Sequence, residues 1–225
     1  MRGNSSSWEA AKIILSAATP IQKLIDPGNK THSFINSQAI SILENENNSP
    51  AVSFLRGNIG IINRGTDWAD NGWKCFAHYY NPYREEGLSP WPNALVECGN
   101  YFKLSLDFLN KKKINKSLFF LGAAAHLVQD LCVPHHSRCI AFNGHQKFEK
   151  WAAKNYLDFT IDRNGIYYLN DTDKILKHNS IISYGLYDNV CRYDTNKYHE
   201  AALILLPLAQ RTSAGLFYLY TGFFD

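Results

Sequence analysis

The sequence predicts an all-α protein that forms a single domain. Several long segments carry apolar residues at helical spacing, whereas alternating strand-like segments are few. The chain has 225 residues, of which 45% are hydrophobic, as is usual for a globular domain with a buried core. No shift in composition divides it. We therefore expect residues 1–225 to form one multi-helix domain.

The predicted helices follow one another along most of the chain. The first spans 31–46, with Thr31 as its candidate N-cap. Its apolar residues recur at helical spacing, namely Phe34, Ile35, Ala39, Ile42 and Leu43. Further helices are expected at 93–110, 117–131, 145–159 and 202–224. Pro207 lies near the start of the last one, where a proline kinks or opens a helix.

Two segments depart from this helical pattern. Residues 64–92 are rich in Gly, Pro, Asn, Asp and aromatic residues, which indicates a long ordered loop. Such loops tend to be functional, and this one carries Asp67, Asp70 and His78. Residues 161–171 contain Asn-Gly flanked by apolar residues, which predicts a short hairpin or a surface loop.

Composition excludes several classes of protein. The net charge is only +3, and the densest basic run is interpreted as a solvated turn rather than an anion-binding patch; it consists of Lys111, Lys112, Lys113 and Lys116. We expect no transmembrane segment, because Pro or polar residues interrupt each apolar run. The polar segment 1–7 is interpreted as a tag or a processed segment.

The cysteines argue against a thiolate metal site. None of the five has CxxC spacing, and we expect most to be free and buried: Cys75, Cys98, Cys132, Cys139 and Cys191. Cys132 and Cys139 are the pair that could bond across a loop.

The strongest functional signal lies between His126 and Glu149. His126 and Asp130 are four residues apart in an apolar helix, and His145 and Glu149 repeat this spacing after a glycine. Side chains at that spacing lie on one helix face and can bind one cation. A single pair of this kind is more often a hydrogen-bonded pair, but two pairs with His136 between them indicate a metal site.

Upstream residues enlarge the candidate ligand set. His32, Asp70 and His78 are added to it, whereas His135 should point away from the cluster, and His178 and His199 should lie on the surface. Imidazole and carboxylate ligands with positions left for water are typical of catalytic zinc. The set is too large for one ion and suits two or three. Such clusters cleave phosphoesters, because one metal activates water while others hold phosphoryl oxygens.

Several segments in order resemble the zinc-dependent phospholipase C family, which includes bacterial lecithinases and alpha-toxin catalytic domains. They are THSFINSQAISILEN, GTDWAD, FAHYYNP, FFLGAAAHLVQDLCVPHH, GHQKFE and AQRTSAGLFYLY. The resemblance covers nearly the whole chain. It implies the all-α fold shared with zinc nucleases. It also implies hydrolysis of phospholipid to diacylglycerol and a phosphorylated head group, by attack of a zinc-activated water.

The resemblance also implies a role for each candidate ligand. A first zinc would bind Asp70, His78, His126 and Asp130, and a second would bind His136, His145 and Glu149. A third would bind His32, with Asp130 as a bridge and Trp8 as an N-terminal ligand if 1–7 is removed. Trp8 is farther from His32 than the family pattern expects. Asp70 would be the general base.

Substrate specificity and location are less directly indicated. Asn71 and Cys75 occupy the two positions where the family's lecithinases place aromatic residues that hold choline, so head-group preference stays open. No C-terminal membrane-binding domain is expected, so contact with membranes would be peripheral. The family is exported, which implies a secreted or extracytoplasmic protein.

Two alternatives stay open. Single-strand-specific zinc nucleases share the fold and the cluster, but their last ligand pair ends in aspartate, whereas this chain has Glu149. We therefore expect no nucleic-acid partner. The second alternative is a relative that binds zinc or lipid without turnover.

Overall fold

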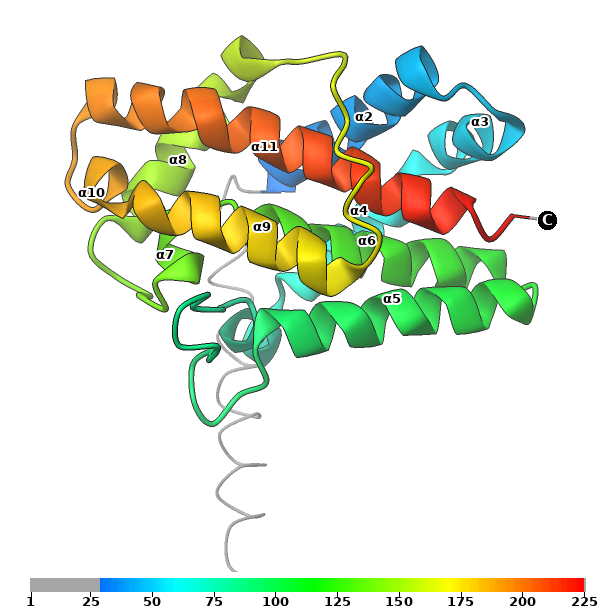
Figure 1. Ribbon diagram of the computed structural model, residues 1–225, viewed down its shortest axis with the longest axis horizontal. Coiled ribbons are helices and arrows are strands. Elements are labelled where there is room, and N and C mark those ends of the chain that lie inside the picture. Colours follow the sequence, from blue (N-terminus) through cyan, green and yellow to red (C-terminus); the bar gives the residue numbers. More distant parts are fainter. Residues whose placement is uncertain (1–28, 225) are drawn as a thin grey trace, which may run out of the picture.

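The computed structural model describes residues 29–224, which form a bundle of helices (Figure 1). Trp8 and the segment 1–7 lie outside the described residues. The elements run α2 (Asn29–Glu46), α3 (Pro50–Gly57), α4 (Ile59–Ala69), η1 (Gly72–Ala77), α5 (Ala94–Asn110), α6 (Ile114–Asp130), α7 (Pro134–Ser137), α8 (His145–Asn155), η2 (Tyr156–Phe159), α9 (Thr172–Gly185), α10 (Tyr187–Val190) and α11 (Thr195–Thr221). The all-α prediction is confirmed.

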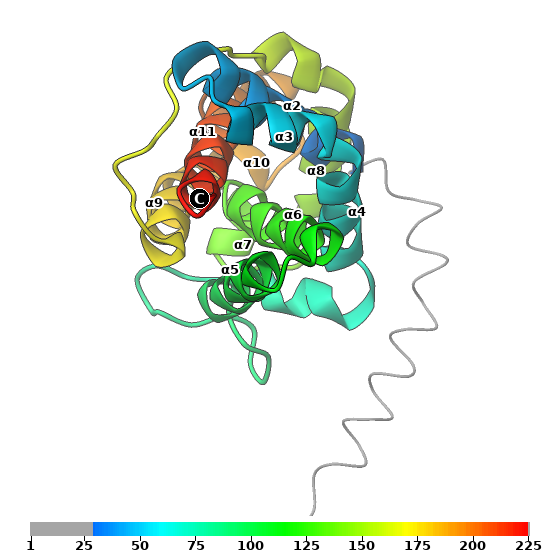
Figure 2. The same ribbon diagram turned by 90° about the vertical axis from the view of Figure 1, so that its right-hand side faces the viewer.

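Helix α6 lies in the middle of the bundle, with α4, α5 and α11 packed around it (Figure 2). Its second half, from Leu121 to Asp130, is buried along its whole length. The main core combines residues of α2, α3, α4, α5, α6, α9 and α11. Helices from both ends of the described chain thus share one core, which favours the predicted single domain.

Helix α11 is the longest element among residues 29–224 and packs against α2, α6 and α9. By length and composition it could cross a membrane, but 67% of its most apolar window is buried among the other helices, as in a core helix of a globular protein. It continues through Pro207 without a break. A proline leaves the carbonyl four residues earlier without its helical donor, and here that residue, Leu203, is 56% exposed, so water can reach it.

Side chains define where several helices begin. Asn93 accepts a hydrogen bond from Val96 N at the start of α5, and Asp171 accepts one from Lys174 N at the start of α9. Asp194 caps α11 in the same way, accepting from the backbone at Asn196 and Lys197. These short polar side chains satisfy amides that have no partner within the helix.

Of the two alternatives predicted for 161–171, the surface loop is confirmed, and within 29–224 the only β-type pairing is an isolated bridge between Asn81 and Glu86. Two other local predictions are wrong. The segment 64–92 is only partly a loop, because α4 and η1 extend into it. Thr31 is not an N-cap, since α2 already includes Asn29.

Candidate metal centre

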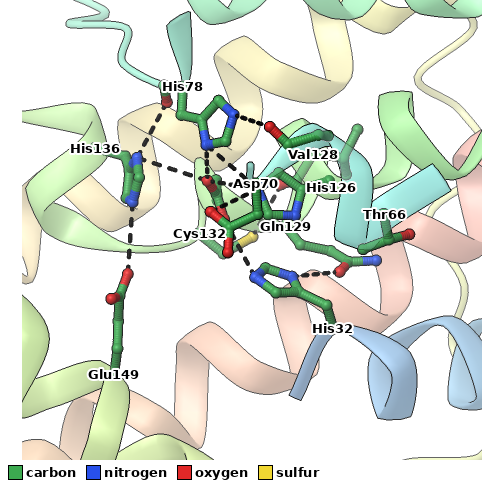
Figure 3. A network of polar contacts seen from close by, with 12 residues as sticks. His32, Thr66, Asp70, His78, His126, Val128, Gln129, Cys132, His136 and Glu149 are labelled. Carbon is green, nitrogen blue, oxygen red and sulfur yellow. Dashed lines mark hydrogen bonds and ion pairs between the residues drawn. The ribbon is translucent and has the colours of Figure 1, made fainter. Parts of the chain in front are cut away.

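Apart from Trp8, the predicted ligands come from six parts of the fold and meet at one place (Figure 3). His32 projects from α2, Asp70 follows the end of α4, and His78 follows η1. His126 and Asp130 come from the buried end of α6. His136 belongs to the short helix α7, and His145 and Glu149 begin α8.

Asp130 is the central residue of the cluster. Its Oδ2 atom lies 2.7 Å from His78 Nδ1, 3.2 Å from His126 Nε2 and 3.8 Å from His136 Nδ1. Its Oδ1 atom lies 3.5 Å from His32 Nε2. Asp70 approaches the same group, with Oδ1 3.8 Å from His126 Nε2. One carboxylate therefore has histidine nitrogens on both of its oxygens, as a bridging ligand requires.

Hydrogen bonds to backbone carbonyls fix three of the histidine rings. His78 Nε2 lies 3.1 Å from Ala69 O, His136 Nδ1 lies 3.2 Å from His78 O, and His145 Nδ1 lies 3.3 Å from Ala141 O. A carbonyl oxygen only accepts, so each of these nitrogens carries the proton. In the neutral ring the other nitrogen then presents a lone pair to the cluster. This arrangement is the usual support for metal-bound histidine.

The lone pairs of one subsite converge on a single point. His136 Nε2 and His145 Nε2 are 3.0 Å apart, and Glu149 Oε1 lies 2.7 Å from His145 Nε2 and 3.6 Å from His136 Nε2. Two imidazole lone pairs and a carboxylate oxygen repel one another unless a cation lies between them. Either a proton or a metal ion can fill that role, and the donor set fits zinc.

Burial and nearby charges together determine the pKa values of the two acidic residues Asp130 and Glu149. Burial disfavours the ionised form of Asp130, but His126 and His136 outweigh it and hold the pKa of this carboxyl well below its usual range. Burial likewise opposes ionisation of Glu149, whose pKa is nevertheless lowered by His145 and His136. Both groups are therefore carboxylates at neutral pH, which is the form that binds metal.

Three groups of side chains place donor atoms close enough together to share an ion. They are His32, His126 and Asp130; Asp70, His78 and His126; and His136, His145 and Glu149. The last group coincides with the predicted second site. The first two share His126, and Asp130 contacts members of all three groups.

His135 faces away from the cluster, as the sequence suggested. Its Nε2 atom donates to Asn143 O at 2.9 Å, and its ring stacks on His145 with centroids 4.8 Å apart. Burial lowers the pKa of His135 to about 4, so the ring is neutral. It therefore supports His145 from behind rather than adding a ligand.

The cluster opens into a cavity of about 500 Å³. The candidate ligands Asp70, Asp130, His136 and Glu149 are among its lining residues. Apolar residues of α2, α8 and α11 also line it, namely Ile35, Phe148, Ala152, Leu205, Leu206 and Ala209, together with the polar residues Gln146 and Lys150 of α8. One cavity is therefore lined both by the candidate metal ligands and by a set of apolar side chains, the apolar wall.

Residues 31–203 match the sequence profile of the family described as zinc dependent phospholipase C. The chain belongs to this family. Zinc is accordingly the metal that the family name assigns to the cluster. The match covers every described residue of the predicted ligand set, from His32 to Glu149.

Known proteins agree with this membership. The phospholipase C of Clostridium novyi is 24% identical over 163 residues, which are 62% of this chain and 41% of the relative. That of Clostridium perfringens is 24% identical over 162 residues, 61% of this chain and 41% of the relative. The chain thus spans less than half the length of these curated relatives. The alpha toxin from Clostridium absonum has the same fold, with a TM-score of 0.76 and 21% identity over 87% of this chain and 64% of its own.

The two predicted head-group positions differ in their setting. Cys75 lines the cavity, where burial and the Asp70 carboxylate raise the pKa of its thiol to about 11. It is therefore a neutral, weakly polar part of the wall. Asn71 is not part of the cavity lining, and its amide donates to Asp67 O. All five cysteines are free, and only Cys98 and Cys132 are buried.

Tyr79 stacks on His136 with centroids 4.7 Å apart and lines the cavity. Other residues of the site were missed from the sequence. Gln129 contacts His32, and the wall residues of α11 lie far along the chain from the ligands. The position of Gln129 between His126 and Asp130 was an available signal, because a polar residue in a buried helix needs a partner.

Proposed function

We propose that this chain is a zinc-dependent phospholipase C that cleaves the glycerol-side phosphodiester of phospholipids. The observation that carries the proposal is the junction, in one cavity, of a carboxylate–imidazole cluster with an apolar wall. The cluster suits a phosphoester, and the wall suits the glyceride part of a lipid. Family membership and the curated relatives named phospholipase C support the same reaction.

Two zinc ions would be held by the described residues. One would be held by Asp70, His78, His126 and Asp130, and the other by His136, His145 and Glu149. A third ion would bind between His32 and Asp130. Trp8 is proposed as its remaining ligand and lies outside the described residues. When bound, zinc lowers the pKa of a water toward 7 and draws charge from phosphoryl oxygens.

Asp70 is the residue we propose as general base. It lines the cavity, and 30% of its side chain is exposed, so a water in the cavity can reach it. Water oxygen forms the new bond to phosphorus, and the bond from phosphorus to the glycerol oxygen breaks. The water proton passes to Asp70 and is then available to the glycerol oxygen, which leaves as the hydroxyl of diacylglycerol.

The apolar wall argues against the nuclease alternative. Both substrates present a phosphodiester, but a nucleic acid adds sugar and base, for which Phe148, Leu205 and Leu206 offer no polar partner. Head-group preference rests on Cys75 and on neighbouring residues of the cavity. We also propose peripheral contact with lipid surfaces and an extracytoplasmic location, which the similarity to clostridial toxins favours.

The test is hydrolysis by the zinc-loaded chain of phospholipid vesicles and of single-stranded DNA. Release of diacylglycerol that stops on chelation and returns with zinc is expected, with the DNA intact. His136→Gln should abolish it, whereas His199→Gln, on the exposed surface, should leave it unchanged. Rapid DNA cleavage with intact lipid would favour the nuclease. Bound zinc with no turnover of any phosphodiester would favour a binding protein.

A further inference from the structure

A buried polar network lies behind His32, on the side away from the other ligands (Figure 3). Its members are Thr66 of α4, Asn36 of α2 and Gln129 of α6. Each of the three is at most 2% exposed. Buried polar groups must satisfy one another, so the hydrogen bonds of this network restrict the orientation of every member.

Thr66 determines the orientation of Asn36. Its Oγ1 atom lies 3.2 Å from Ile62 O and 3.0 Å from Gly122 O. A hydroxyl has one proton, and these carbonyls only accept, so the proton of Thr66 is used by one of them. Oγ1 can therefore only accept from Asn36, 3.0 Å away. The Asn36 nitrogen must face Thr66, where it also donates to Asn63 Oδ1 at 2.9 Å.

Asn36 in turn orients Gln129. With its nitrogen facing Thr66, Asn36 presents Oδ1 to Gln129 Nε2 at 2.8 Å. Gln129 Nε2 also donates to Ser213 Oγ at 3.2 Å, so both of its protons are used. Gln129 Oε1 is then the atom that faces His32 Nδ1, at 2.8 Å.

The end of the network fixes the tautomer of His32. An amide oxygen only accepts, so His32 Nδ1 carries the proton, and Nε2 keeps its lone pair in the neutral ring. That Nε2 atom lies 3.5 Å from Asp130 Oδ1, in the group formed with His126. The ring is therefore held in the one tautomer that can bind a metal beside Asp130.

We propose that Thr66, Asn36 and Gln129 form a positioning relay that holds His32 Nε2 unprotonated and directed at the third metal position. The inference rests on the proposed metal centre. Only Gln129 touches His32; the other two act through it. Loss of such supporting partners typically weakens metal binding about 10- to 100-fold.

The tautomer can be measured on the unaltered chain. Imidazole nitrogen NMR of the zinc-free protein, with the ring neutral, should show His32 protonated at Nδ1. Protonation at Nε2 would overturn the relay without affecting the proposed reaction. This measurement needs no variant and so does not depend on how any variant folds.

Three variants test the link to zinc, with affinity measured by competition with a coloured chelator. Gln129→Met, of similar size, should weaken the binding of the most weakly held zinc ion about 10- to 100-fold. Thr66→Val should weaken the binding of the same ion to a smaller extent. Thr212→Val is the matched control, because Thr212 is also a buried threonine that accepts from an asparagine amide, Asn179 Nδ2 at 3.0 Å, and donates to a carbonyl, Leu208 O at 2.8 Å.

The outcomes are distinct. Thr212→Val should keep the zinc affinity of the unaltered chain, whatever its effect on stability. Equal zinc affinity in Thr66→Val, Gln129→Met and Thr212→Val would overturn the relay. An unaltered chain that binds no zinc would instead overturn the proposed metal centre, and the tautomer measurement would still report on the network.

Discussion

Gly65 of α4 and Gly122 of α6 lie at a reciprocal close contact between the two helices. A Cβ atom at Gly65 would lie 1.8 Å from Phe119 O, and one at Gly122 would lie 1.9 Å from Ile62 O. Both positions thus require glycine, because any side chain would meet backbone of the facing helix. The contact also sets the distance between the end of α4, which carries Asp70, and His126, one turn beyond Gly122.

Gly122→Ala should destabilise the fold and weaken zinc binding together. The added methyl group has backbone in its way, so α4 and α6 must separate, at a cost of about 1–3 kcal/mol. Their separation moves Asp70 away from His126. Denaturant unfolding and zinc affinity measure the two effects.

Gly99→Ala is the matched control on α5. A Cβ atom there would meet nothing nearer than Thr172 Oγ1 at 3.9 Å. Removing glycine from a helix without a clash stabilises the fold by about 0.4–1 kcal/mol. Unchanged stability and zinc affinity in Gly122→Ala would show that the helix contact does not position Asp70.

Zinc removal should lower the stability of the chain. Without a cation, His136, His145 and Glu149 bring lone pairs and a negative charge together. A ligand that binds only the folded state adds about 2.7 kcal/mol when present at 100 times its Kd. Thermal unfolding before and after chelation measures this difference, which zinc should restore.

Glu149→Gln should remove most of this gain at one subsite. The amide keeps the shape of the side chain but lacks the negative charge that attracts the metal ion. The zinc content should therefore fall by one ion. Glu200→Gln is the control, because Glu200 is exposed on α11 and contacts Asn189 rather than the cluster. Full zinc content in Glu149→Gln would exclude Glu149 as a ligand.

How far the sequence predicted this structure depends on the range of the interactions. The pairs His126–Asp130 and His145–Glu149 follow from helical spacing alone, and both are close contacts, at 3.2 and 2.7 Å. Helices α5 and α6 were found in the same way. Local periodicity was sufficient for these features because each lies within one helix.

Features that depend on packing between distant segments were missed. For the segment 161–171 the sequence left a hairpin and a surface loop open; it is a loop, and its backbone at Asn164 and Gly165 donates to Glu46 of α2. The apolar wall of the cavity joins α11 to α2 and α8, and no local pattern reveals which face of α11 meets the ligands. The orientation of Gln129 likewise depends on Thr66, which lies in another helix.

The contacts of Glu46 predict that its attachment of the segment 161–171 to α2 depends on pH. Its carboxylate accepts from Asn164 N, from Gly165 N at 3.0 Å and from Tyr167 Oη at 2.6 Å. Slight burial opposes ionisation, but these donors lower the pKa of Glu46. A depressed pKa in the folded state stabilises the protein above the unfolded pKa, about 4.3, and this contribution disappears as pH falls through the folded pKa.

Glu46→Gln should therefore lower the melting temperature slightly at neutral pH, with a difference from the unaltered chain that shrinks in acid. The effect is small because Glu46 is exposed. Tyr167→Phe removes one of the three donors and should lower the melting temperature by part of the same amount. A difference that stays constant down to strongly acidic pH would contradict this pH-dependent attachment.

Ala209→Leu tests whether the apolar wall accommodates lipid. Ala209 lies on α11, is 2% exposed and lines the cavity, so the larger side chain can extend into open space instead of packed core. Hydrolysis of long-chain phospholipid should fall about tenfold, as expected when an apolar pocket loses room for its ligand. A small water-soluble phosphodiester should be hydrolysed as before, and zinc content should not change. Equal losses on both substrates would place the effect on the metal cluster, whereas unchanged lipid hydrolysis would place the acyl chains outside this cavity.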